Sequence, residues 1–148
     1  MPHTRVICEV QDVEPFNLFT AIKERRKVKE VRVIPTVTAD SPPSKWETFL
    51  PENMSVPTNT FSLLIHNGKG DMKEYYVAQA NLYFTFEAML YVENYNTCIP
   101  GSSYDSALAL YRSFYKGRVS IKYVVAIILE REIPITKEAL EQYKKEVV

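Results

Sequence analysis

The sequence SIKYVVAIILER, residues 120–131, decides the expected fold, because it contains the longest unbroken aliphatic run of the chain, Val124 to Leu129. Ser120 can cap a helix that starts after Gly117, and Ile133-Pro134 interrupts the pattern. We predict a helix from Ser120 to Arg131 that is apolar nearly all round and therefore forms the structural centre. The aliphatic run is far shorter than the roughly 18 apolar residues that a membrane span needs.

Amphipathic helices are predicted on both sides of this segment. Upstream, a pattern at helical spacing follows a capping signal formed by Ser102 and Asp105. Its apolar members are Tyr104, Ala107, Leu108, Tyr111 and Tyr115. Downstream, Thr136 can cap a helix that carries Ala139, Leu140, Tyr143 and Val147 on one side. Three helices would thus form a C-terminal unit over residues 103–148, joined to the rest of the chain by a hinge at 97–102.

The first two thirds of the chain favour a sheet. Strands are predicted over 5–13 and 28–38, the second at a sheet edge because it contains Pro35. A helix is expected over 15–27, and Asn67-Gly68 predicts a β-hairpin over 61–77. Residues 39–59 form a proline-rich loop. Residues 81–96 fit both the period of a strand and that of a helix, and the alternation favours a strand.

Together these patterns predict an α+β fold, in which an N-terminal antiparallel sheet with one helix (1–96) is followed by the three-helix unit. A chain of 148 residues is expected to form a single domain over 1–148. Four glycines with many charged residues are typical of a thermophile or of a virus of such a host.

Cys8 and Cys98 stand far apart, with no histidine at metal-ligand spacing near either. We interpret them as buried free thiols, and the alternative is a single bridge between them. Since the N-terminus lacks the pattern of a signal peptide, a soluble cytoplasmic protein is expected.

The sequence contains no constellation typical of catalysis. Its two histidines are His3, near the end of the chain, and His66, at the hairpin turn. No residue pair has the spacing of a metal site, and the glycines around Lys69 do not match a phosphate-binding loop. We therefore expect a protein that is not an enzyme, with no catalytic residues, no metal and no cofactor.

Two features favour nucleic-acid binding as an alternative function. The first is a basic run within residues 23–32, which could neutralise several phosphates although Glu24 and Glu30 offset it. Its members are Lys23, Arg25, Arg26, Lys27, Lys29 and Arg32. The second is the segment Ser120–Lys145, in which a break at Ile133-Pro134 separates two predicted helices. This segment resembles a generic helix-turn-helix, with Lys137 on the helix that would read DNA, but Glu138 and Glu141 beside Lys137 would repel phosphates.

The preferred expectation is a small non-enzymatic binding protein that acts through protein–protein interaction, with self-association as a C₂ homodimer the simplest arrangement. An apolar central helix must be covered on every side, and a second subunit would meet any shortfall. Tyr111 and Tyr115, like Tyr91, suit such a surface. Trp46 and Phe49 in the proline-rich loop either pin the loop to the body or anchor a partner. Neither a membrane nor a small-molecule ligand is expected.

Overall fold

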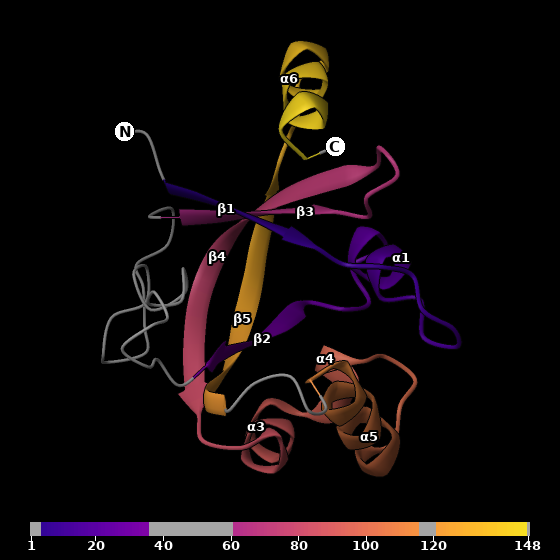
Figure 1. Ribbon diagram of the computed structural model, residues 1–148, viewed down its shortest axis with the longest axis vertical. Helices are drawn as coiled ribbons and strands as arrows, with labels where there is room; N and C mark the ends of the chain where they lie inside the picture. Colours follow the sequence, from indigo (N-terminus) through magenta and orange to yellow (C-terminus); the bar gives the residue numbers. More distant parts are fainter. Residues whose placement is uncertain (1–3, 36–60, 116–120, 148) are drawn as a thin grey trace.

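The computed structural model describes residues 4–35, 61–115 and 121–147 and shows a curled five-stranded sheet with helices at both ends (Figure 1). The strands are β1 (Thr4–Glu9), β2 (Lys29–Pro35), β3 (Phe61–His66), β4 (Met72–Tyr83) and β5 (Ile121–Ile133). The helices are α1 (Leu18–Lys23), α3 (Phe86–Glu93), α4 (Tyr95–Cys98), α5 (Tyr104–Tyr115) and α6 (Lys137–Val147). The expected α+β fold is confirmed.

The sheet has the strand order β1-β3-β4-β5-β2. Neighbouring strands are antiparallel except β1 and β3, which pair in parallel from Thr4 opposite Phe61 to Glu9 opposite His66. The expectation of a purely antiparallel sheet is therefore wrong at this pair. The predicted edge position of the Pro35 strand is confirmed, since β2 is the outermost strand beside β5.

The predicted helix from Ser120 to Arg131 is wrong, because residues 121–133 form strand β5. This strand pairs with β4 on one side and β2 on the other, and Val124, Val125, Ala126 and Ile127 are all buried. A strand covered on both faces is apolar without alternation, so its sequence resembles that of a buried helix. Its β-branched residues favour the strand. The C-terminal three-helix unit does not exist, because the middle segment belongs to the sheet.

The preference for a strand over 81–96 is wrong for most of that stretch. Strand β4 continues only to Tyr83, and α3 follows. Thr85 caps this helix, with its hydroxyl oxygen accepting a hydrogen bond from the Ala88 amide at 3.1 Å. The inner side of α3 buries Phe86, Met89 and Leu90. Residues 86–93 therefore form a helix rather than a strand, because the helical period places these three side chains in the core.

Most of the remaining expectations about elements are confirmed. The helix α1 lies within the predicted 15–27, the hairpin of β3 and β4 turns at Gly68, and α5 matches the predicted amphipathic helix. The hydroxyl of Thr136 accepts a hydrogen bond from the Ala139 amide at 3.1 Å and so caps α6. The hinge expected at 97–102 is packed rather than open, since Cys98 and Ile99 are fully buried. The loop 39–59 lies outside the described residues.

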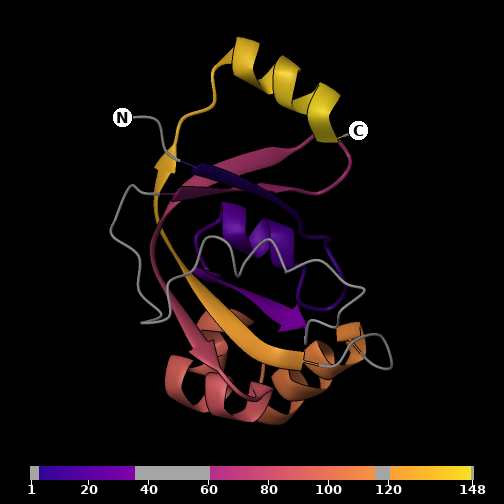
Figure 2. The same ribbon diagram turned by 60° about the vertical axis from the view of Figure 1, so that its left-hand side comes forward.

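The curl of the sheet brings its two edge strands together. The Arg32 guanidinium on β2 donates a hydrogen bond of 2.7 Å to the Glu9 carbonyl at the end of β1, although β1 and β2 are at opposite edges. Figure 2 shows the sheet bending around α1, with α6 at one end and α3, α4 and α5 gathered at the other. The main core fills this curl, and a smaller cluster joins Tyr143 of α6 to Leu64 of β3 and Met72 of β4. In the described ranges, every helix is too short or too polar to cross a membrane.

Candidate functional site

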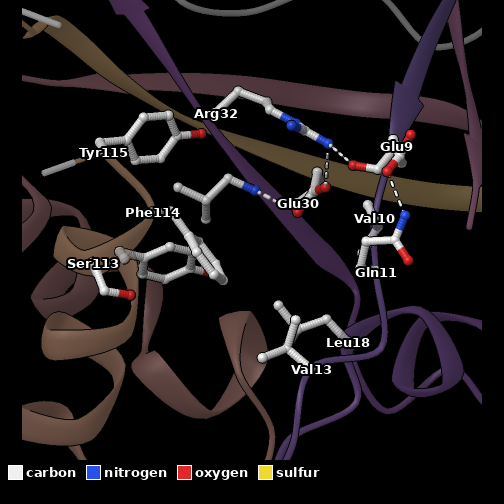
Figure 3. Close-up of a pocket in the computed structure, with 12 residues that line it drawn as sticks. Glu9, Val10, Gln11, Val13, Leu18, Glu30, Arg32, Ser113, Phe114 and Tyr115 are labelled. Atoms are coloured by element: carbon white, nitrogen blue, oxygen red, sulfur yellow. Dashed lines mark hydrogen bonds and ion pairs between the residues drawn. The ribbon is translucent and has the colours of Figure 1, made fainter. Parts of the chain in front are cut away.

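A cavity of about 460 Å³ opens where the two sheet edges approach each other. Three parts of the chain form its walls: the end of β1 and the segment after it together with Leu18, strand β2, and the C-terminal part of α5 (Figure 3). The lining residues are Glu9, Val10, Gln11, Val13, Leu18, Glu30, Val31, Arg32, Tyr111, Ser113, Phe114 and Tyr115. A volume in this range is typical of small-molecule sites, which combine apolar walls with a few polar groups.

Arg32 and Glu30 form the charged wall of the cavity. They lie two residues apart on β2, so both side chains project from the same face of this edge strand. The Arg32 guanidinium donates a hydrogen bond of 3.1 Å to the Glu30 carboxylate, and its side chain is 25% exposed. Its Nε, however, is buried and has no hydrogen-bond partner among the described residues. An arginine held in place by one terminal nitrogen can still donate hydrogen bonds from the rest of its guanidinium.

Behind this wall, Lys27 is fully buried and joins the start of β2 to the end of α4. Its ammonium donates to the carbonyls of Lys29 at 2.5 Å and Cys98 at 2.6 Å, and lies 3.6 Å from the Glu30 carboxylate. Burial lowers the pKa of this ammonium, while Glu30 acts in the opposite direction. Because its donors are occupied by these acceptors, Lys27 positions Glu30 and does not reach the surface.

Both cysteines are free and buried, so the alternative of a Cys8–Cys98 bridge is wrong. Burial raises the pKa of the Cys8 thiol to about 12, despite the nearby charge of Arg32. A thiol with so high a pKa contains almost no thiolate at neutral pH and is a poor nucleophile.

Helix α5 contributes the aromatic wall. Tyr111 is 2% exposed, and its hydroxyl has no hydrogen-bond partner among the described residues. Phe114 contacts the Tyr111 ring edge to face, with centroids 6.5 Å apart. Burial raises the pKa of Tyr115 and that of Tyr111, so both phenols stay protonated. A buried hydroxyl without a hydrogen-bond partner costs free energy, and a functional role is one explanation for such a group.

The structure brings Arg32, Tyr111 and Tyr115 together in one cavity, although the sequence assigned them to different functions. Sequence reasoning missed the role of Glu30, which was interpreted only as an offset to the basic run, and it missed Phe114. The alternation of Glu30 and Arg32 along a predicted edge strand was the one signal that could have identified the charged wall.

The other members of the basic run are occupied by neighbouring groups. Lys23 pairs with Asp71 at 2.6 Å, Arg26 with Glu24 at 2.6 Å, and Lys29 with Glu93 at 3.0 Å. The Arg25 guanidinium lies 4.9 Å from the centre of the Tyr75 ring. Lys27 has no exposed surface with which to contact a phosphate. Binding of nucleic acid by the exposed members of the run stays a prediction.

The helix-turn-helix resemblance is not matched by the fold, since its first helix is strand β5. Lys137 begins α6, at the end of the molecule opposite α3 and α5 (Figure 1). Trp46 and Phe49 lie outside the described residues. The Nδ1 of His66 accepts a hydrogen bond from the Gly68 amide at 3.1 Å, which gives this histidine a local role in the turn.

Glu93, at the end of α3, is the centre of a second buried polar cluster. Its carboxylate accepts hydrogen bonds from the Tyr83 hydroxyl and from the Asn81 amide at 2.7 Å, and pairs with Lys29 at 3.0 Å. Burial alone would raise the pKa of Glu93, but these hydrogen bonds and the Lys29 charge together lower it below its ordinary value. The cluster joins the end of α3 to β4 and β2.

The outer side of α3 is exposed and apolar. Phe84, just before the helix, is 80% exposed, and within the helix Tyr91 is 86% and Val92 is 64% exposed. Tyr91 also lines a groove of about 370 Å³ with Leu90, Asn94, Tyr95, Asn96 and Tyr104. We call Phe84, Tyr91 and Val92 the α3 outer face. A helix that is apolar on both sides indicates that something covers its second side.

No family model and no curated protein matches this chain. Two solved structures are similar to it. The crystal structure of hypothetical protein PH0355 has a TM-score of 0.57 and 21% identity, and the match covers 88% of this chain and 100% of that one. The solution NMR structure of protein PF0455 from Pyrococcus furiosus has a TM-score of 0.55 and 25% identity, covering 86% of this chain and 96% of that one. These likenesses show a shared fold. A thermophilic archaeon among the sources fits the thermophile-like composition.

Proposed function

We propose that this protein is a small non-enzymatic binding protein that acts by contact with another protein or with a second copy of itself. The α3 outer face is the observation that carries the proposal. Its three members are the most exposed large hydrophobic residues in the described part of the chain. Exposed aromatic side chains of this kind are enriched at protein interfaces, where burial of each contributes strongly to binding.

The chemistry of the buried groups supports the non-enzymatic part of the proposal. The Cys8 thiol is protonated and enclosed, and the ring of His66 is engaged in its own turn. Lys27, whose pKa is lowered, is hydrogen-bonded to two carbonyls and has no access to solvent. Each of these three side chains is buried, so none is presented to a substrate at the surface.

The test is the molar mass in solution over a hundredfold concentration range, together with cross-linking from a photoreactive residue at position 91. We expect either a mass that rises with concentration or one defined cross-linked partner. Replacing Tyr91 and Val92 together by serine should abolish that association while the protein stays folded. Lys69→Ser, an exposed change at the β3–β4 turn, should leave it intact. A monomer at every concentration with no partner specific to position 91 would contradict the proposal.

A further inference from the structure

The cavity between β2 and the end of α5 has features that a protein-binding face does not need. Its apolar walls come from Val10, Val13, Leu18 and Phe114, and its polar groups converge from β2 and α5. In Figure 3, the Arg32 side chain extends toward Glu9 and Glu30. Ser113 and Phe114 lie on one side of the residues drawn, and Val13 and Leu18 lie on the other. This combination is typical of a site that encloses a small ligand and orients it with a few polar contacts.

Two buried donors of this site lack acceptors. They are the Nε–H of Arg32 and the hydroxyl of Tyr111, and neither has a partner among the described residues. A buried polar group without a partner costs free energy, and a ligand that brings an acceptor recovers it. The ligand is therefore expected to carry oxygen atoms that accept hydrogen bonds, rather than an amine that donates them.

The charges at the cavity select among oxygen-bearing ligands. Arg32 lines its inner part, and Lys27 lies behind the wall without lining the cavity; both pair with the single carboxylate of Glu30. One negative charge on the ligand would balance this group. Glu9 lies at the exposed rim, and together with Glu30 it would repel a multiply charged anion such as phosphate. A singly charged carboxylate is the group that fits, because it pairs with a guanidinium through two parallel hydrogen bonds.

We propose that this cavity binds a small organic acid, with one carboxylate held by Arg32 and a flat apolar body packed against Phe114. Tyr111 would donate its hydroxyl to the same end of the ligand, while Val10, Val13 and Leu18 enclose the body. This ligand is separate from the protein partner of the α3 outer face, and the two proposals can fail independently.

The experiment is an NMR titration of the full chain, in which the Arg32 Nε–H and the backbone amides of 30–32 and 113–115 are followed. Three probes share one indole body: indole-3-acetate carries the carboxylate, indole-3-acetamide is neutral, and tryptamine carries an ammonium. Inorganic phosphate is the fourth probe. We expect saturable shifts at these resonances with indole-3-acetate, weaker binding of the amide, and none with tryptamine or phosphate.

Two variants test the assigned contacts. Tyr111→Phe removes only the unpartnered hydroxyl, so the thermal midpoint should not fall, while affinity for indole-3-acetate should drop about three- to tenfold. Arg32→Lys keeps the charge but loses the planar fork, and should weaken binding about tenfold or more. Arg112→Lys, on the exposed side of α5, is the matched control and should bind as the unmodified protein does.

Three results would overturn the proposal. One is the absence of saturable binding of indole-3-acetate at millimolar concentration. Another is equal or tighter binding of tryptamine or phosphate at the same resonances. The third is unchanged affinity in both Tyr111→Phe and Arg32→Lys, with dispersed spectra showing that the two variants are folded.

Discussion

Replacing Ile127 by alanine tests whether β5 is the centre of the fold. Ile127 is 0% exposed and lies between Ala80 on β4 and Glu30 on β2. The substitution removes three carbon atoms, and at about 0.8 kcal/mol per buried methylene the transfer term alone is about 2.4 kcal/mol. The cavity left between three strands adds to this loss, so we expect a total of about 3–4 kcal/mol. For a domain of this size that lowers the thermal midpoint by on the order of 10 °C.

The assay is urea unfolding followed by circular dichroism at several protein concentrations, with Ile128→Ala as the matched control. Ile128 is only partly buried, although the chemical change is identical, so its substitution should cost less than about 2 kcal/mol. If Ile128→Ala lowers the free energy of unfolding by as much as Ile127→Ala or by more, the orientation of the β5 side chains is refuted. A midpoint that rises with protein concentration, in Ile127→Ala and in the unmodified protein alike, would show that folding is linked to self-association.

Three further outcomes follow from single contacts. Because the pKa of Glu93 is lowered in the folded state, its ionised form stabilises the protein above its ordinary pKa, and this contribution is lost as the pH falls through the folded value. The stability of the wild type relative to Glu93→Gln should therefore be greatest near about pH 7 and should decrease as the pH falls below the ordinary carboxyl pKa of about 4.3 in urea titrations, and a constant difference would argue against it. Cys8 and Cys98 should react with a disulfide reagent at about pH 8 only after unfolding, since burial raises the pKa of both thiols, and rapid labelling of the native protein would contradict their burial. Thr136→Ala removes the cap that the Ala139 amide uses and should destabilise α6 by about 1 kcal/mol, seen as faster amide exchange confined to this helix. If the α6 amides exchange at the same rates in Thr136→Ala and in the unmodified protein, the cap does not contribute to the stability of the helix.

The sequence alone determined the elements whose signals are local. An amphipathic period buries Ala107 and Tyr111 on α5, a side-chain cap begins α6 at Thr136, and Asn67-Gly68 begins the loop between β3 and β4, in which Gly68 and Gly70 have positive φ. Each of these rests on residues within one or two turns of one another, so no distant part of the chain is needed to specify it. The mixed α+β class follows from the same local patterns.

The tertiary structure decided the state of residues 121–133 and the location of the cavity. An apolar run such as Val124 to Leu129 can be a buried helix or a buried strand, and pairing with β4 and β2 selects the strand. Arg32 and Tyr111 are separated by most of the chain and meet only because the sheet curls until its edges approach and α5 closes that end. Which polar atoms remain without partners depends on this packing, and no pattern along the chain encodes it.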